Sequence, residues 1–328
     1  MLITRTPYRI SFLGGGTDYP DWFRKHGGGQ VISTSIDKYS YVTINNLNKF
    51  FKYFFRIRYY YREETSKISD IKHPTIRNAL KMFKMKNGLD IYHYGELPAR
   101  TGIGSSSSFT VGLVHSLHKI NSSKFDKKKI TEDSIFIEQE LNKESIGSQD
   151  QVATCYGGFN NIKFDKKKIL ISNLNNKYKK NISIIEDSCL LFYSGKQRES
   201  SKITKNLIQK IDINKNYFYN IKDLTNEGLK ILKSSNFRIG EFGNVISEAW
   251  KSKNEISKNY TNIKINELFL DSKSFGTKGY KMLGAGSEGF FILIAEKKFH
   301  KKLIMRYKNY LNVKIKFENE GSKIIYEK

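Results

Sequence analysis

A glycine- and serine-rich stretch at residues 97–108, LPARTGIGSSSS, constrains the folding of this chain more than any other feature. It runs directly into the apolar sequence FTVGLVHSLHKI, which predicts a helix from about Ser106 to Ile120. Gly102 and Gly104 can adopt positive φ and let the backbone approach a ligand closely. The N–H groups at such a helix start lack a carbonyl partner, so together with the helix dipole they attract phosphate oxygens. The stretch predicts a triphosphate-binding loop or, as the simpler alternative, a serine-capped helix after a flexible turn.

The composition is that of a folded protein with one large or two ordinary domains. The 328 residues are 38% hydrophobic and 27% charged and include 20 Tyr and 22 Phe. The formal net charge of +25 permits a nucleic-acid or membrane partner. The lysines are nevertheless spread along the whole chain, with only short runs such as 127–129 and 166–168. We therefore expect no nucleic-acid partner and no membrane partner, but a positive field that favours anionic substrates such as ATP or sugar phosphates.

The two cysteines and the N-terminal segment indicate the compartment. Cys155 and Cys189 lie far apart and have no histidines at ligand spacing, so we expect buried, unpaired thiols. The start MLITRTPYRISFL lacks the pattern of a signal peptide, and no stretch has the uninterrupted apolar length of a membrane span. These observations predict a cytoplasmic protein.

Strands are expected to surround the loop and its helix. Periodicity and turn residues predict one or two strands at 2–13, a strand pair at 31–45, a helix at 74–85, a strand at 89–94 and a helix from Thr131 with acidic residues in its first turn. The segment 50–61, FFKYFFRIRYYY, is aromatic and basic. It predicts a strand with one packed face, or alternatively a stacking surface for single-stranded nucleic acid.

The second half of the chain predicts a strand, several helices and then mixed elements. The expected order is a strand at 189–195, long polar helices to about 258, a helix at 267–281, a strand at 290–295, a helix at 298–311 and strands at 313–317 and 323–326. This order is typical of an α+β fold in which the helices lie on one face of a sheet.

Residues 284–289 match the pattern G-x-G-x-x-G, which raises a dinucleotide-binding enzyme as an alternative. We interpret the match otherwise, because a helix is expected before these glycines and a strand after them. In addition, residues 303–312 offer no acidic residue for a ribose. The chain also lacks the G-x-x-x-x-G-K-[ST] loop and the H-R-D set of other ATP-dependent enzymes.

Three acidic residues are candidates for chemistry. Asp18 follows the glycine triplet 14–16, where bare backbone would let a ligand sit close while the carboxylate accepts hydrogen bonds from its hydroxyls. Glu138 and Asp150 are too far apart in sequence to be neighbours on one helix. They form a common site only if the fold brings them together; otherwise each is an ordinary surface acid, and the glycine triplet an ordinary loop.

Separated stretches of the chain resemble the motifs of the GHMP kinase superfamily, which includes galactokinase, homoserine kinase and mevalonate kinase. The matching stretches are PYRISFLGGGTDY at 7–19, PARTGIGSS at 98–106, GSQDQ at 147–151 and LGAGSEG at 283–289. The first stretch is most similar to heptose 7-phosphate kinases, with fucokinases as near relatives. The resemblance implies a two-domain α+β fold with an N-terminal ATP-binding part at 1–185, similar to ribosomal protein S5 domain 2, and a ferredoxin-like part at 186–328. The active site would lie in the cleft between them.

The resemblance also implies roles for individual residues. ATP would be held by Pro98, Arg100, Thr101, Gly102, Ile103, Gly104, Ser105, Ser106 and Ser107, and Mg²⁺ by Ser106 and Glu138. Asp150 would orient or deprotonate the attacking hydroxyl, and Arg9 would stabilise the transferring phosphoryl group. The sugar would be bound by Gly15, Gly16, Thr17, Asp18, Gly284 and Gly286. For a distal phosphate on the substrate, Arg198 is the first candidate, ahead of Lys196 and Arg100.

The implied activity is phosphorylation of the anomeric C1 hydroxyl of D-glycero-D-manno-heptose 7-phosphate, with ATP and Mg²⁺. The product, a 1,7-bisphosphate, would serve the synthesis of nucleotide-activated heptose for capsules or surface polysaccharides. Galactokinase has Glu-His where this chain has Gly15-Gly16, which argues against galactose as the substrate. The alternatives are a fucokinase-like sugar 1-kinase or a basic RNA-binding module. We also expect a possible homodimer.

Overall fold

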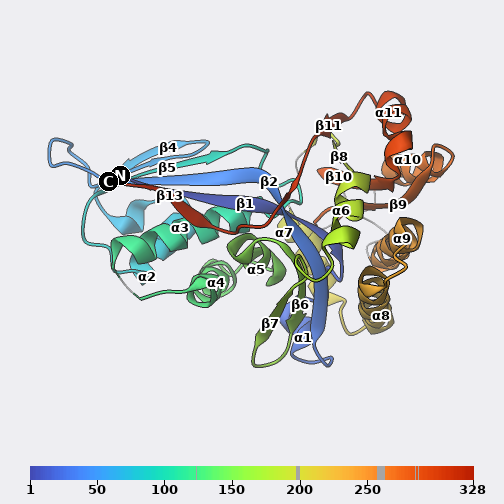
Figure 1. The fold of residues 1–328 in the computed structure, drawn as a ribbon. Coiled ribbons are helices and arrows are strands. Elements are labelled where there is room, and N and C mark those ends of the chain that lie inside the picture. Colours follow the sequence, from blue (N-terminus) through green and yellow to red (C-terminus); the bar gives the residue numbers. More distant parts are fainter. Residues whose placement is uncertain (123, 197–199, 257–262, 285, 287) are drawn as a thin grey trace.

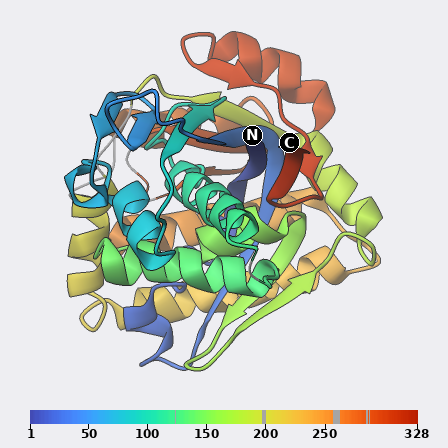
Figure 2. The ribbon, with the colours of Figure 1, turned by 90° about the vertical axis from the view of Figure 1, so that its left-hand side faces the viewer.

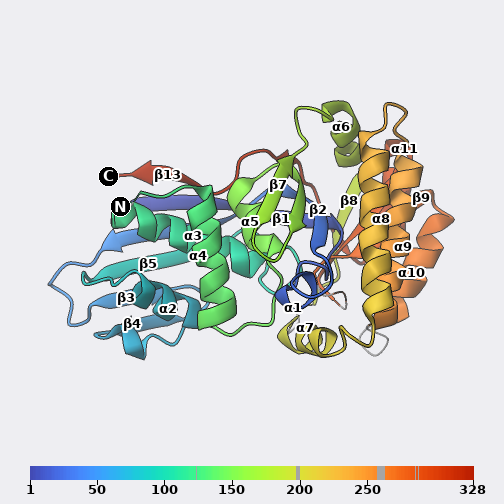
Figure 3. The same ribbon diagram turned by 90° about the horizontal axis from the view of Figure 1, so that it is seen from below.

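Two β-sheets, side by side, organise the protein (Figure 1). The structure is a computed structural model that describes the chain except for residues 123, 197–199, 257–262, 285 and 287. Helices cover one face of the larger sheet and pack around the smaller one (Figure 3). This is the α+β arrangement that the order of elements predicts.

The large sheet contains the N-terminal strand and the last two strands of the chain. Its members are β1 (Leu2–Leu13), β2 (Gly29–Asn46), β3 (Phe55–Arg58), β4 (Arg62–Thr65), β5 (Leu89–Gly95), β6 (Phe159–Phe164), β7 (Ile169–Asn173), β12 (Phe317–Glu318) and β13 (Lys323–Glu327). The main order is β13-β1-β2-β5-β3-β4, while β6 and β12 pair with β2, and β7 pairs with β6. Only the β3–β5 pairing is parallel among the described strands.

The expected strand pair at 31–45 is wrong, because β2 is a single strand of 18 residues. Its first part pairs with β6 and its second part with β5, so one strand joins two parts of the sheet. The register against β1 shifts where Pro7 faces Tyr39 and Tyr8 faces Ile36. A bulge of this kind bends a strand without a turn, and local sequence does not distinguish the two cases.

Segment 50–61 forms a strand only at Phe55–Arg58, where the alternating Phe55 and Ile57 are buried. This part agrees with the interpretation of a strand with one packed face. The flanking aromatic side chains include Phe50, which is 92% exposed, and Tyr60, which is 88% exposed.

Helices cover the lower face of the large sheet (Figures 1 and 3). They are α2 (Pro74–Met82), α3 (Ser105–Ile120), α4 (Lys127–Phe136) with the π-helix η2 (Ile137–Leu141), and α5 (Gln149–Tyr156); two short helices, α1 (Pro20–Phe23) and η1 (Ile68–Asp70), lie elsewhere in this half. The helix expected from Thr131 begins instead at Lys127, because the Asp126 side chain caps it by accepting a 2.7 Å bond from the Lys129 N–H. The acidic residues therefore fall outside its first turn.

The small sheet contains β8 (Cys189–Tyr193), β9 (Thr277–Met282), β10 (Phe290–Ala295) and β11 (Leu311–Val313), in the antiparallel order β11-β8-β10-β9. Its helices are α6 (Lys179–Ser188), α8 (Lys215–Lys233), α9 (Ile239–Ile256), α10 (Ile263–Lys273) and α11 (Lys297–Arg306). Helix α7 (Ser200–Gln209) instead packs through Leu207 in an apolar cluster with Trp22 and Phe23 of α1 and Phe164 of β6.

The helix expected at 267–281 is wrong beyond Lys273. Gly276, with φ +96°, follows the helix end, and residues 277–282 pair with β10 as strand β9. The glycines at 284–289 therefore connect two strands of a hairpin. A dinucleotide loop requires a helix after its glycines, and β10 follows here instead.

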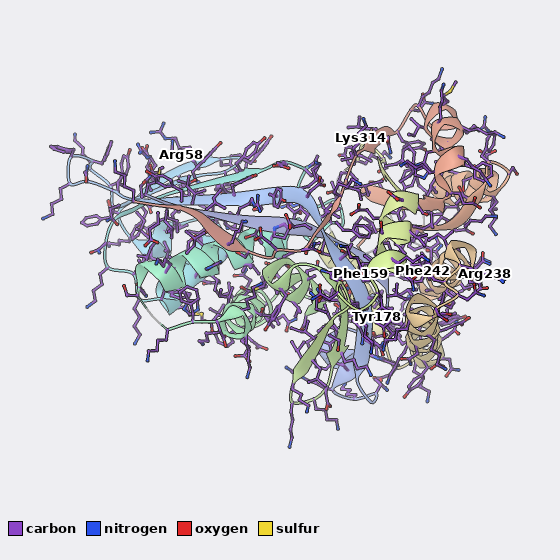
Figure 4. All side chains as sticks on the ribbon, in the orientation of Figure 1. Arg58, Phe159, Tyr178, Arg238, Phe242 and Lys314 are labelled. Atoms are coloured by element: carbon purple, nitrogen blue, oxygen red, sulfur yellow. The ribbon has the colours of Figure 1, made fainter. Side chains whose placement is uncertain are left out.

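The two sheets share one apolar core. Phe12 of β1 stacks on Phe159 of β6 at 5.5 Å between ring centroids and contacts Phe242 of α9 at 6.1 Å. All three side chains are fully buried, and Figure 4 shows Phe159 and Phe242 at the junction between the sheets. Burial of each ring contributes about 1.5–3 kcal/mol, so this junction fixes how the sheets sit against each other.

The last segment of the chain returns to the large sheet. Strand β13 pairs with β1, and the N-terminal ammonium donates to the Lys328 carbonyl at 2.7 Å, so the termini lie together (Figure 2). The chain after residue 186 thus contributes strands to both sheets, and the division into 1–185 and 186–328 stays a prediction. Cys155 and Cys189 are buried and free, as expected. None of the described helices is long and apolar enough to cross a membrane.

Candidate active site

The glycine-rich stretch is a loop that opens helix α3, as predicted. Gly104, in the left-handed region at φ +73°, precedes the first helical residue, Ser105. Gly102 has φ +88°, and a Cβ there would lie 2.5 Å from the Leu283 carbonyl oxygen. Both glycines are therefore required by backbone geometry, and Gly102 also by crowding. The first N–H groups of α3 have no preceding helical carbonyl and can bind an anion.

Neighbouring backbone holds this loop on two sides. The Arg9 N–H of β1 donates to the Ile103 carbonyl at 3.0 Å, and the Phe290 N–H of β10 donates to the Thr101 carbonyl at 2.9 Å. A Cβ at Gly289 would lie 2.3 Å from the Thr101 oxygen. The β9–β10 connection thus packs against this loop. The glycine-rich stretches at 98–106 and 283–289, which are far apart in the sequence, are therefore in contact.

Within the loop, Arg100 and Ser106 are exposed, whereas Thr101, Ile103 and Ser107 are buried. The Thr101 hydroxyl donates to the Pro98 carbonyl at 2.7 Å. These contacts stabilise the loop from within, so the surface that it offers to a ligand is mainly backbone and serine hydroxyl.

Arg9 and Asp150 form a bidentate ion pair beside the loop. The Arg9 Nε and Nη2 donate to the two Asp150 carboxylate oxygens at 2.8 and 2.7 Å, and Nη1 donates to the Gly102 carbonyl at 2.7 Å. The Arg9 side chain is 4% exposed and the Asp150 side chain 24%. A Cβ at Gly104 would approach Arg9 Cγ at 3.1 Å and Asp150 Oδ2 at 3.5 Å. A carboxylate and a cation are thus fixed next to the glycine-rich loop.

Asp18 is buried beside the start of α5. Its carboxylate accepts from the Gly16 N–H at 2.9 Å and the Gln149 N–H at 3.3 Å. Burial raises the pKa of Asp18, and the charge of Asp150 raises it further, whereas each hydrogen bond from the Gly16 and Gln149 N–H groups lowers it by less than burial raises it. A Cβ at Gly147 would lie 1.8 Å from Asp18 Oδ2, which explains the glycine of the GSQDQ stretch.

Two other residues of the stretch at 7–19, Thr17 and Gly16, stabilise the backbone turn that precedes Asp18. Thr17 is fully buried, and its hydroxyl donates to the Gly14 carbonyl at 2.8 Å. Gly16 has φ +111°, and a Cβ there would lie 3.2 Å from the Phe218 ring. Gly15 differs, because its φ is ordinary and a Cβ would meet only normal contacts.

Glu138 lies in the π-helix η2, with its carboxylate directed to the start of α3. It is fully buried and accepts hydrogen bonds from Thr110 Oγ1 at 2.8 Å, Ser107 Oγ at 2.9 Å and Ser106 Oγ at 3.3 Å. The amide of Gln151, next to Asp150 in α5, also donates to it. The fold thus brings the segments of Glu138 and Asp150 together. A π-helix at this place is a common feature of functional sites that no sequence pattern indicated.

Burial raises the pKa of Glu138 to about 7, and the charge of Glu144 adds to this effect. The site offers one carboxylate and several hydroxyl oxygens, and no cluster of three or more metal-ligating side chains occurs among the described residues. This donor set fits Mg²⁺, which retains waters and takes few protein ligands together with phosphate oxygens.

The sequence did not predict two lysines that lie at the site, because nothing distinguishes them from the many other lysines of the chain. Lys281 of β9 donates from Nζ to the carbonyls of Ser11 and Phe12, both at 2.8 Å. Lys253 of α9 donates to the Gly284 carbonyl at 2.7 Å. Burial holds the pKa of Lys281 well below its usual range, and the charges of Lys253 and Arg9 lower it further. Three cations therefore gather where the two sheets meet.

The remaining predicted residues make no side-chain contact with Arg9, Asp18, Glu138 or Asp150 among the described contacts. Gly284 and Gly286 have φ +66° and +105°, and a Cβ at Gly286 would lie 3.0 Å from the Trp250 ring. Lys196 is exposed and pairs with Glu288 at 3.1 Å. Arg198 lies outside the described residues.

A glycine-rich loop at a helix start, a paired arginine and aspartate, and a buried carboxylate beside the helix start are the kinds of group that phosphoryl transfer requires. Residues 72–158 match the family described as the GHMP kinases N terminal domain. This part of the chain is therefore similar to the N-terminal domain of these kinases.

Relatives over the whole chain agree with this assignment. The chain is 24% identical to D-glycero-alpha-D-manno-heptose 7-phosphate kinase of Campylobacter jejuni, with 98% of this chain and 97% of the relative covered. It is 23% identical to the bifunctional fucokinase/GDP-fucose pyrophosphorylase of Arabidopsis thaliana over 88% of this chain, but only 29% of that larger protein is covered.

Solved structures show the same fold. A D-glycero-D-manno-heptose 1-phosphate kinase from Bacteroides thetaiotaomicron superposes with a TM-score of 0.78 at 19% identity, with both chains fully covered. A mevalonate kinase superposes with a TM-score of 0.73 at 18% identity, covering 98% of this chain and all of the other. The predicted GHMP kinase fold is confirmed.

Proposed function

We propose that this kinase transfers the γ-phosphoryl group of ATP to the anomeric C1 hydroxyl of D-glycero-D-manno-heptose 7-phosphate. The observation that carries the proposal is the continuous set of contacts from the glycine-rich loop through Arg9 to Asp150, with Asp18 close enough for the charge of Asp150 to raise its pKa. The full-length similarity to a heptose 7-phosphate kinase supports the choice of sugar. The 1,7-bisphosphate product would feed nucleotide-activated heptose synthesis in the cytoplasm.

The backbone of the loop and Arg9 would stabilise charge on the transferring group. Phosphoryl transfer has a loose transition state with charge spread over equatorial oxygens, so positioning and electrostatics provide most of the catalysis. The N–H groups at the start of α3 would bind the triphosphate. Arg9, held by the Gly102 carbonyl and Asp150, would present its guanidinium without reorganisation.

Asp150 would act on the acceptor hydroxyl. Its carboxylate is held by Arg9, and its 24% exposure leaves the group accessible to a substrate. It would orient the C1 hydroxyl and accept its proton during transfer. Asp18 would bind sugar hydroxyls through the oxygen lone pairs that the Gly16 and Gln149 N–H groups do not use.

Glu138 and Ser106 would hold Mg²⁺. When bound, the ion would neutralise part of the charge on the ATP phosphates. The chain's own contribution is the orientation of the Glu138 carboxylate by Ser107, Thr110 and Gln151.

A kinase assay across a panel of acceptors tests the proposal. Heptose 7-phosphate, unphosphorylated heptose, L-fucose and D-galactose would each be offered with ATP and Mg²⁺, and the product identified by ³¹P NMR as an anomeric phosphate. We expect the highest kcat/KM for heptose 7-phosphate. Preference for L-fucose would instead support the fucokinase-like alternative, which the similarity to the Arabidopsis protein favours.

A further inference from the structure

Gly15 leaves a space that is bordered by polar atoms. A Cβ built on this residue would lie 3.7 Å from Gln149 Nε2, 3.8 Å from Lys253 Nζ and 3.9 Å from Ser11 Oγ. These are ordinary van der Waals distances, and φ of Gly15 is not in the left-handed region. Neither backbone geometry nor crowding therefore requires a glycine here, unlike at Gly14, Gly16 and Gly102. The missing side chain keeps a small volume open between three hydrogen-bonding groups.

Two of the bordering side chains have polar atoms without a protein partner. Ser11 Oγ and Gln149 Oε1 are buried atoms with no hydrogen-bond partner in the described part of the chain. Ser11 is 5% exposed and Gln149 9% exposed. Leaving a buried polar atom unsatisfied costs about 1–3 kcal/mol, so the Ser11 hydroxyl, which can donate, points to a ligand that accepts a hydrogen bond. Gln149 Oε1 only accepts, and the atom of this amide that borders the space and can donate to an anion is Nε2.

Two lysines lie near this space. Lys253 projects from α9 and also donates to the Gly284 carbonyl, which anchors its ammonium at this place. Lys281 lies on the other side of Ser11, bonded to the Ser11 carbonyl. Among the neighbouring acids, Asp150 is paired with Arg9 and Asp18 accepts backbone N–H groups. An anionic group would therefore be attracted to the space beside Gly15.

We propose that the space beside Gly15 is a binding subsite for the non-transferred phosphate of a sugar phosphate, with Lys253 as its cation and Ser11 and Gln149 as its neutral hydrogen-bonding groups. The inference rests on the proposed function. It assigns binding of the distal phosphate to Lys253, in place of the candidates Arg198, Lys196 and Arg100. Gln149 is adjacent to Asp150, and Gly15 is in the same turn as Asp18. One sugar could thus present its C1 hydroxyl to Asp150, its other hydroxyls to Asp18 and its terminal phosphate to Lys253.

The subsite also gives the glycine a function. A glutamate at position 15, which galactokinase has at the corresponding place of the motif, would fill the space and pair with Lys253. The Gly15 and Lys253 combination would therefore select a phosphorylated acceptor, since a phosphate and a side-chain carboxylate cannot occupy the same volume.

The test compares phosphorylated and unphosphorylated acceptors in the full-length protein. In Lys253→Met, which removes the charge and keeps an unbranched side chain, we expect kcat/KM for heptose 7-phosphate to fall roughly 10–100-fold relative to that for unphosphorylated heptose. KM for ATP should stay within about twofold. Lys253→Arg should restore part of the selectivity. Lys251→Met is the matched control, because Lys251 lies on the same helix but is half-exposed and pairs with Glu248.

Inorganic phosphate, used as a probe, separates failure of the subsite from failure of the proposed substrate. We expect it to inhibit competitively against the accepted sugar, and both Lys253→Met and Gly15→Glu to weaken this inhibition. If the wild-type protein prefers an unphosphorylated sugar, the proposed function is wrong, yet phosphate inhibition that depends on Lys253 still supports an anion subsite. If Lys253→Met lowers kcat/KM equally for both acceptors, or leaves phosphate inhibition unchanged, the subsite is refuted.

Discussion

The two sides of the site are built differently. The large-sheet side consists of Arg9, Asp18, Glu138, Asp150 and the loop before α3, and its acids are held by short hydrogen bonds from the same half of the chain. The small-sheet side consists of Lys253, Lys281 and the β9–β10 connection, and its cations bond to backbone carbonyls. The first side has the fixed hydrogen-bond geometry that the proposed phosphoryl transfer requires, whereas the second contributes lysine side chains where the two sheets meet.

This difference suggests that the two sides have different functions. Variants on the large-sheet side should change the chemical step or the nucleotide, and variants on the small-sheet side should change which acceptor is used. The predictions below follow the expected size of the effect.

The largest effect is expected for Asp150→Asn. The amide keeps the shape of the side chain but loses the charge that pairs with Arg9 and that would accept the proton in the proposed reaction. We expect kcat to fall about 10²–10⁴-fold with little change in ATP affinity. Steady-state kinetics and calorimetric titration with a non-hydrolysable ATP analogue would measure the two quantities. Full activity of the variant would remove Asp150 from this role.

Gly102→Ala tests the contact between the two sides. Its methyl group would meet the Leu283 carbonyl oxygen at 2.5 Å in addition to the unfavourable φ of +88°. The φ penalty is about 1–2 kcal/mol, and overpacking adds about 1–3 kcal/mol to the loss in the free energy of unfolding. Urea denaturation would measure the loss, and KM for ATP should rise.

Gly27→Ala is the control for this variant, because Gly27 has φ +72° with nothing within 4 Å of a built Cβ. It should show the φ penalty alone. Equal destabilisation by both substitutions would mean that the loop and the β9–β10 connection do not constrain each other.

The pH dependence of metal use tests Glu138. Its pKa of about 7 means that the carboxyl group is protonated below pH 7 and ionised above it. Each pH unit below the pKa leaves about tenfold less carboxylate, so the Mg²⁺ concentration for half-maximal activity should rise as the pH falls from 8 to 6. Glu138→Gln should need more Mg²⁺ at every pH and lose this dependence. A wild-type requirement for Mg²⁺ that is independent of pH would argue against Glu138 as a ligand.

The smallest effect is expected far from both sides of the site. The exposed aromatics Phe50 and Tyr60 lie before and after β3, the strand next to the edge strand β4 of the large sheet. Replacing both with serine should change kcat/KM by less than about twofold, because surface substitutions are usually near neutral. The same variant tests the nucleic-acid alternative, since loss of a salt-dependent RNA affinity would give these side chains a function of their own.

Local sequence was sufficient for the elements whose signals are local. The helix after the glycine-rich loop was predicted within one residue of its start at Ser105, and the strand at 290–295 has the predicted limits. The glycines marked the loop because positive φ is a property of single residues. Asp18 was found because it follows such glycines, although the reason for Gly147 opposite it needed the structure.

Tertiary structure decided the features that depend on distant partners. Residues 277–282 are a strand because β10 offers them an edge, and the 18 residues of β2 stay one strand because two different strands pair along them. The π-helix around Glu138 was equally invisible in sequence.

The sequence by itself determined the glycine-rich loop that opens α3, the candidate acids and the class of fold, because glycine backbone freedom and hydrophobic periodicity act within a few residues. The tertiary structure decided which of the chain's lysines reach the site. Lys253 and Lys281 have no distinguishing sequence context among 57 basic residues. Only the packing of the two sheets places Lys281 against the Ser11 carbonyl and Lys253 beside Gly15.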